Sequence, residues 1–249
     1  MNTRNIRFRS NRVRDVLALY HEELDGLYGS GEVGVFVEML FEAFLGWDRV
    51  RLMCSKEQTI DQSDLLRFHW ALEDLKGYRP IQHIVGYVNF CGCRIGVGSD
   101  VLIPRPETEE MVNYIVEGGG RSVERVVDLC TGSGCIAIAL KRAFPTAEVT
   151  AVEVSSTALE MAHHNAEENG AEIRFVQADL LAWQPSESDG CDAPGYDLIV
   201  SNPPYVRESE RHAMQRNVLD HEPALALFVP DDAMYGLKPS SSKRFCKRS

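Results

Sequence analysis

Residues 126–153, VVDLCTGSGCIAIALKRAFPTAEVTAVE, decide the fold of this chain. An apolar stretch of strand length leads through a glycine-containing turn into an amphipathic helical pattern, and a second apolar stretch closes the segment. Strand, helix and strand in this order are the repeating unit of a parallel sheet. The pattern continues with a helix at 157–169 and strands at 173–179 and 196–201. We therefore predict a doubly wound α/β domain with helices on both faces of a parallel sheet.

The part of the chain before this domain is predicted to be a small helical domain spanning residues 1–79. Its apolar residues recur at helical spacing, and the last of its helices is expected to begin at Ser63. Gly77 can take the left-handed conformation that ends this helix, and Pro80 cannot continue it. A domain boundary is therefore expected between residues 79 and 80.

Two further segments complete the predicted organisation. Aromatic and branched residues around Gly92 indicate a short β-hairpin within residues 80–100, which would connect the two domains. The α/β domain is assigned to residues 101–234 and opens with a helix capped by Thr108. An irregular tail rich in Ser and Lys is expected at 235–249.

The composition excludes several classes of protein. Hydrophobic residues make up 44% of the 249 residues and charged residues 25%, as in ordinary globular proteins. A formal net charge of -11 argues against gripping a nucleic-acid backbone, because proteins that do so cluster Lys and Arg. The seven cysteines form no CxxC pair and no Cys/His spacing suited to zinc, so we expect reduced thiols and no metal. Without a secretory signal or a membrane-spanning stretch, a cytoplasmic protein with no membrane partner is expected.

Residues that follow the strands are the candidates for ligand binding, because ligands of doubly wound sheets lie outside the carboxyl ends of the strands. After the first strand, Gly132 and Gly134 allow the backbone to approach a ligand before a helix begins. After the second, Glu153 can accept hydrogen bonds from the hydroxyls of an adenosine ribose. Asp179, after the third, is a candidate acceptor for an adenine amine, although a helix cap explains it nearly as well. Both NAD and S-adenosylmethionine contain that ribose, so these residues leave the cofactor open.

The loop after the fourth strand, Asn202-Pro203-Pro204-Tyr205, favours S-adenosylmethionine and methyl transfer. Two consecutive prolines fix an extended backbone and remove two N–H donors, so the loop offers carbonyl oxygens. The side-chain carbonyl of Asn202 and the backbone carbonyl of Pro203 can accept both N–H bonds of a planar NH2 group, and Tyr205 can stack on its plane. Hydride transfer does not need this arrangement. We therefore predict a methyltransferase that acts on a planar amide or amine nitrogen, with these four residues as its catalytic and substrate-binding loop.

Several motifs resemble those of the HemK-like, or PrmC, protein-glutamine methyltransferases, which modify peptide chain release factors. They are PIQHIVG at 80–86, VLIPRPETE at 101–109, DLCTGSGCIAIAL at 128–140, the loop at 202–205 and HEPALAL at 221–227. The resemblance implies a class I, Rossmann-like sheet that binds S-adenosylmethionine. It also implies methylation of a glutamine side-chain amide, in the GGQ motif used for translation termination. Release factors would be the protein partners, with no direct nucleic-acid binding.

The same resemblance assigns site residues and reveals two departures. The predicted cofactor-binding set is Asp128, Cys130, Thr131, Gly132, Ser133, Gly134, Glu153, Asp179, Leu180 and Asn202. Residues 130–134 of this set would line the methionine end of the cofactor, and Glu153 would bind its ribose. Glu153 stands where the family usually has Asp. Cys130 replaces the first glycine of the family's Gly-x-Gly-x-Gly loop, a conservative change if that position has ordinary backbone angles.

Two other interpretations stay open at this point. The same loop can hold the amine of a flipped adenine, as in a DNA adenine methyltransferase. The segment MYGLKPSSSKRFCKRS at 234–249 lacks the strand pattern with which the family continues. The chain is therefore expected to lack the C-terminal strands of the family, and a truncated, catalytically impaired or non-catalytic remnant is the third reading.

Overall fold

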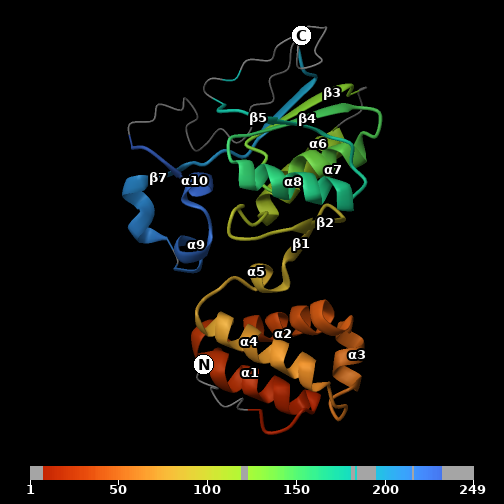
Figure 1. Cartoon of the computed structure of the whole chain (residues 1–249), viewed down its shortest axis with the longest axis vertical. Coiled ribbons are helices and arrows are strands. Elements are labelled where there is room, and N and C mark those ends of the chain that lie inside the picture. Colours follow the sequence, from red (N-terminus) through yellow and green to blue (C-terminus); the bar gives the residue numbers. More distant parts are fainter. Residues whose placement is uncertain (1–7, 119–122, 181–182, 184–194, 215, 232–249) are drawn as a thin grey trace. The chain divides into compact units, whose positions relative to one another are not determined.

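The computed structural model describes residues 8–118, 123–180, 183, 195–214 and 216–231 (Figure 1). The chain divides into two compact units, Met1–Val85 and Gly86–Ser249. The division falls after helix α5 (Ile81–Val85), whereas the sequence predicts it between residues 79 and 80. Helix α5 belongs to the helical unit because Ile81 is buried in the core of that unit. The predicted tail at 235–249 lies outside the described residues. None of the helices in the described ranges is long and apolar enough to cross a membrane.

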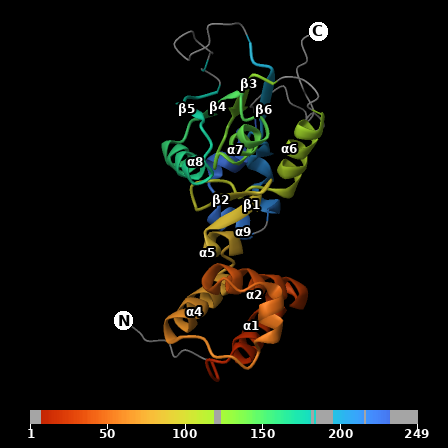
Figure 2. The same ribbon diagram turned by 90° about the vertical axis from the view of Figure 1, so that its right-hand side faces the viewer.

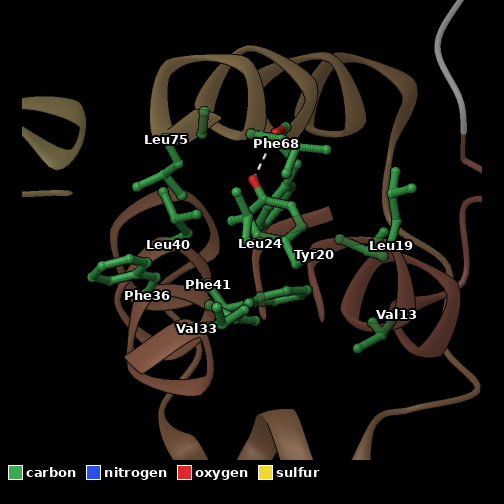
Figure 3. Close-up of a cluster of buried hydrophobic side chains, with 14 of the residues drawn as sticks. Val13, Leu19, Tyr20, Leu24, Val33, Phe36, Leu40, Phe41, Phe68 and Leu75 are labelled. Atoms are coloured by element: carbon green, nitrogen blue, oxygen red, sulfur yellow. Dashed lines mark hydrogen bonds between the residues drawn. The ribbon is translucent and has the colours of Figure 1, made fainter. Parts of the chain in front are cut away.

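The first unit is helical, as its spacing predicts. It contains α1 (Val13–Tyr28), α2 (Ser30–Leu45), α3 (Arg49–Cys54), α4 (Gln62–Lys76) and α5. Their apolar faces meet in one core, in which the rings of Phe41 and Phe68 lie 4.6 Å apart between centroids (Figure 3). The buried hydroxyl of Tyr20 donates a 2.6 Å hydrogen bond to the Phe68 carbonyl, so this polar group has a partner inside the core.

The ends of α4 differ from the expectation. The helix begins at Gln62, one residue before Ser63, with Asp61 as the preceding cap residue. Gly77 has a φ of -82°, and Tyr78 instead takes the left-handed conformation with a φ of 61°. The Tyr28 and Tyr78 rings lie 5.7 Å apart, and this packing offers a physical reason for the left-handed residue being a tyrosine and not a glycine.

The second unit contains the predicted α/β sheet. Its first elements are β1 (Tyr87–Phe90), β2 (Cys93–Gly96), α6 (Pro106–Gly118), β3 (Arg125–Leu129), α7 (Cys135–Ala143) and β4 (Glu148–Glu153). There follow α8 (Ser156–Glu168), β5 (Arg174–Gln177), β6 (Leu198–Ser201), β7 (Val206–Arg207), a 3-10 helix at Glu208–Ala213, α9 (Arg216–His221), α10 (Ala224–Leu227) and β8 (Phe228–Val229). The four strands expected from the sequence are β3, β4, β5 and β6.

These four strands form one parallel sheet in the order β5-β4-β3-β6. Val126, Val149 and Val200 belong to the buried cluster that the sheet shares with α7. Helices α6, α7 and α8 lie on the same face of the sheet in both views (Figure 2). The sequence predicts helices on both faces of the sheet, and in the described ranges these three helices cover one face.

The hairpin β1–β2 belongs to the second unit and is hydrogen-bonded to α8. Cys91 and Gly92 connect its strands with φ values of 48° and 71°, the two positive values that a tight two-residue turn requires. The fully buried Asn165 of α8 accepts a 2.8 Å hydrogen bond from the Gly96 amide and donates one of 3.0 Å to the Gly96 carbonyl. Asn165 also donates to the Ser133 carbonyl at 2.8 Å, so the hairpin and the glycine loop share one buried anchor.

Candidate active site

The sheet order brings two of the predicted loops to neighbouring strand ends. Strand β3 lies between β4 and β6, and the register pairs Leu129 with Val152 on one side and with Ser201 on the other. The Ser201 hydroxyl donates a 2.8 Å hydrogen bond to the Leu129 carbonyl. The glycine loop after β3 and the loop at 202–205 after β6 therefore start side by side. Strands β4 and β6 lie on opposite sides of β3, so the direction of the strand order changes here, which is where doubly wound sheets bind ligands.

The two glycines of the loop after β3 have different roles. Both have positive φ values, 54° at Gly132 and 81° at Gly134. A Cβ atom added at Gly132 would have no atom within 4 Å, so this glycine faces open space where a ligand can approach. A Cβ atom at Gly134 would lie 3.1 Å from the Cβ of Ala162 on α8. Gly134 therefore makes room for a helix, and its predicted contact with a cofactor stays a prediction.

Cys130 has a left-handed backbone, with a φ of 61°. Replacing glycine by cysteine would be conservative only with ordinary backbone angles, and Cys130 does not have them. A residue with a side chain is strained in this conformation by about 1–2 kcal/mol. Burial, together with the nearby carboxylates of Glu153 and Asp128, raises the pKa of the Cys130 thiol to about 11. The thiol is thus protonated at neutral pH and is a poor nucleophile.

Asp128 lies beneath the glycine loop and not on its open side. The residue is fully buried, and the Thr131 hydroxyl donates a 2.5 Å hydrogen bond to its Oδ2. Its Oδ1 has no hydrogen-bond partner in the described part of the chain. Burial raises the pKa of Asp128 to about 7, although the Thr131 hydroxyl opposes the shift. Thr131 and Ser133 are also buried, so contact of these three residues with a cofactor stays a prediction.

Glu153, at the end of β4, accepts hydrogen bonds from the residues that follow it and from the glycine loop. Its Oε2 accepts a 2.9 Å hydrogen bond from the Gly132 amide, and its Oε1 accepts from the amides of Val154 and Ser155 at 2.9 and 3.1 Å. A carboxylate has about four acceptor positions. Three are used by the backbone, so about one, on Oε2, is left for a ligand hydroxyl where the sequence suggested two.

Asp179 and Leu180 follow β5, at the same edge of the sheet. The Ala178 amide donates to the Glu153 carbonyl at 3.0 Å, which attaches this segment to the end of β4. The Trp183 amide donates to the Asp179 carbonyl at 2.8 Å. This position suits the predicted contact with an adenine, which stays a prediction for both residues.

The loop at 202–205 combines one anchored residue with one exposed ring. Asn202 is partly buried, and its Nδ2 donates a 3.3 Å hydrogen bond to the Thr108 hydroxyl. Pro203 and Pro204 are partly buried, and no peptide bond in the described residues is cis. The Tyr205 side chain is 74% exposed and is therefore available to a substrate.

Thr108 itself is not the start of its helix. Helix α6 begins at Pro106, and the amides of Thr108 and Glu109 donate to the Arg105 carbonyl at 3.0 and 3.2 Å. The rigid φ of proline suits the first helical position, so Pro106 starts the helix two residues before the predicted cap. The Thr108 side chain is thereby left to accept from Asn202.

A partly buried ion pair supports the start of α6. The carboxylate of Glu222 is 1% exposed, and its Oε1 accepts a 2.5 Å hydrogen bond from Arg105 Nη2. Its Oε2 accepts from the Ile103 amide at 3.2 Å. Arg105 and Glu222 belong to two motifs quoted above, 101–109 and 221–227, but neither they nor Thr108 was predicted as a site residue. The signal that could have pointed to these residues in the sequence is that they belong to the quoted motifs.

Comparisons with known proteins group this chain with one set of enzymes. Residues 89–225 match the family described as methyltransferase small domain, and residues 22–86 match the PrmC N-terminal domain. A release factor glutamine methyltransferase of Flavobacterium psychrophilum is 37% identical over 224 residues, covering 88% of this chain and 76% of that protein. Proteins of the same name from Bacteroides thetaiotaomicron and Bacillus subtilis are 39% and 42% identical. They cover 87% and 79% of this chain and are themselves covered over 76% and 68%.

Proposed function

The chain belongs to the release factor glutamine methyltransferase family, and from this membership we propose that it methylates the side-chain amide nitrogen of a glutamine in a peptide chain release factor. The fold is that of a class I methyltransferase, as the sequence predicts, and the cofactor is S-adenosylmethionine. The GGQ motif is the proposed target, and the cytoplasm is the proposed compartment.

One observation carries the proposal: the two loops that the reaction needs start at adjacent strand ends. The Ser201–Leu129 hydrogen bond joins the residue before Asn202 to the residue before the glycine loop. A group held by the first loop would therefore lie next to a group held by the second. Methyl transfer requires this proximity, because the attacking nitrogen must approach the methyl carbon in line with the breaking bond.

The residues of the second unit fit the cofactor. Gly132 faces open space, and Glu153 has one acceptor position left after binding three amides. When bound, S-adenosylmethionine supplies an electrophilic methyl group on a positively charged sulfur. Glu153 would bind its ribose, and the buried support of Asp128 and Asn165 would keep the glycine loop in shape. The remaining residues of the predicted cofactor set are proposed on the same grounds.

The loop at 202–205 would hold and activate the glutamine amide. An amide nitrogen is a poor nucleophile because its lone pair is delocalised. Asn202 Oδ1 and the Pro203 carbonyl would accept its two N–H bonds and stabilise the positive charge that develops on nitrogen during transfer. Pro204 keeps the loop rigid, and the exposed Tyr205 ring would stack on the plane of the amide. The nitrogen then loses a proton to solvent, so no general base is needed.

The experiment incubates the whole chain with isotopically labelled S-adenosylmethionine and a purified release factor, and then locates the label by mass spectrometry. We expect the label on one glutamine. A duplex DNA containing adenine tests the DNA methyltransferase reading, which the net charge of -11 disfavours. Label found on DNA alone would overturn the proposal. The proposal would also be overturned if neither substrate is labelled although the chain unfolds cooperatively and binds the cofactor. The second result would support the non-catalytic reading.

Asn202→Ala is the variant that tests the loop. It removes one of the two acceptors for the amide, so methyl transfer should fall by about a hundredfold or more. Cofactor affinity, measured by calorimetry, should change far less, because the proposed cofactor contacts lie mainly on the glycine loop and Glu153. A variant that transfers methyl groups at a near-normal rate would show that Asn202 does not hold the amide.

A further inference from the structure

We propose that Thr108 is a positioning residue of this enzyme, which fixes the orientation of the Asn202 carboxamide so that its oxygen faces the substrate amide. The inference rests on the proposed function and adds a residue to it. Thr108 lies in the first turn of α6, 94 residues before Asn202. Its side chain is 8% exposed, and the Asn202 carboxamide is its partner at 3.3 Å.

A carboxamide has two ends of similar size and opposite hydrogen-bonding character. Rotation by half a turn would replace the acceptor Oδ1 of Asn202 by the donor Nδ2. A substrate NH2 group would then face another NH2 group, and two donors repel each other. Acceptance of the substrate therefore depends on which end of the carboxamide faces outward.

In the structure the Thr108 hydroxyl holds the carboxamide in one of these orientations. Its oxygen accepts from Nδ2, so Nδ2 faces α6 and Oδ1 faces away from it. In the described part of the chain no residue donates a hydrogen bond to Oδ1. This atom is therefore left to accept from a substrate. Holding a reacting group in one orientation before the substrate arrives lowers the entropic cost of the reaction.

The position of Thr108 is itself secured by the chain on both sides. Pro106 limits the first turn of α6, and the Arg105 carbonyl accepts from the Thr108 amide. The Arg105 guanidinium is paired with Glu222, whose carboxylate is almost fully buried. The threonine hydroxyl is thus presented from a rigid element, which a group that orients another side chain requires.

The first measurement compares Thr108→Val with Thr108→Ser. Valine keeps the shape of threonine but cannot accept a hydrogen bond, so kcat for release factor methylation should fall about tenfold, the usual worth of one such bond. The dissociation constant for S-adenosylmethionine should stay unchanged. Serine restores the acceptor, so kcat should recover. Thr146→Val is the matched control, because Thr146 is exposed and precedes β4 at the opposite edge of the sheet.

The second measurement needs no ligand and no activity. The side-chain NH2 signals of Asn202 are recorded by ¹H–¹⁵N NMR and identified by their loss in Asn202→Asp. They should shift in Thr108→Val, return toward the wild-type position in Thr108→Ser, and stay in place in Thr146→Val. Backbone amide signals of residues 130–134 should be the same in all three variants.

The outcomes separate this inference from the proposed function. NH2 signals that do not move in Thr108→Val, or a kcat equal to wild type in that variant, would overturn the role of Thr108. Equal losses in the valine and serine variants would point to packing and would overturn it as well. If the wild type methylates no release factor, the proposed function fails, while the NMR comparison still decides whether Thr108 orients Asn202.

Discussion

Replacing Glu153 with alanine should weaken cofactor binding through two effects. The carboxylate accepts hydrogen bonds from the amides of Gly132, Val154 and Ser155 and has about one acceptor position left for a ribose hydroxyl. Glu153→Ala removes that position from the ligand. It also releases the Gly132 amide, which loosens the loop that the ligand must contact.

The size of each effect follows from the contacts. One hydrogen bond to a charged group is worth about 1.5–3 kcal/mol, so the dissociation constant should rise about 10- to 150-fold. Water can reach the half-buried carboxylate and can solvate the three released amides. The free energy of unfolding without cofactor should therefore fall by only about 1–3 kcal/mol in total.

Calorimetric titration with S-adenosylmethionine and urea unfolding measure the two quantities. Glu148→Ala is the matched control, because Glu148 is exposed at the amino end of the same strand. Glu153→Gln should also bind weakly, since one amide oxygen cannot serve both sets of backbone donors. A dissociation constant within about threefold of wild type for Glu153→Ala would show that the ribose is bound elsewhere.

Three further predictions follow from the glycine loop and its support. Burial raises the pKa of Asp128 from 3.8 to about 7, so its contribution to stability is complete below about pH 4 and is lost as pH rises through 7. Asp128→Asn should therefore gain stability relative to wild type between about pH 5 and about pH 8 in urea unfolding, and a difference independent of pH would contradict this. Because Cys130 has a φ of 61°, Cys130→Gly should be about 1 kcal/mol more stable than Cys130→Ala by the same method, and equal stabilities would argue against strain there. Gly132→Ala and Gly134→Ala should both lower the thermal unfolding temperature, because both positions have a positive φ, but Gly134→Ala should lower it more by pressing on Ala162 and Gly132→Ala should reduce cofactor affinity more; the reverse pattern would refute the two roles.

Local patterns in the sequence were sufficient to predict the parallel strands and two loops that the structure brings side by side. The alternation of apolar strands and amphipathic helices depends on residues close together in the chain, which is why the four strands of the sheet could be located. Their carboxyl ends then indicated the glycine loop, Glu153 and the loop at 202–205. The helices that cover the sheet, all on one face in the described residues, could not be placed from periodicity alone.

Contacts between distant residues and unusual backbone angles could not be predicted. The hydrogen bond from Asn202 to Thr108 joins two helix-and-loop motifs that no local pattern relates. Tyr78 adopts a left-handed conformation next to a glycine that could have done so, and its ring lies 5.7 Å from that of Tyr28, a contact that no local pattern indicates. Likewise, a Gly-x-Gly spacing does not say which glycine faces a ligand and which faces a helix, as Gly132 and Gly134 show.

The pairing of Arg105 with Glu222 has a consequence for the order in which the protein becomes functional as it is synthesised. Glu153 follows Gly132 by 21 residues, whereas Glu222 follows Arg105 by 117. At about 5–20 residues per second, the ribosome needs about 6–23 seconds to bridge the longer interval. A nascent chain can thus form the contacts of its cofactor loop well before the buried anchor of α6 exists. Of these two contacts, the one that supports α6 is therefore completed second.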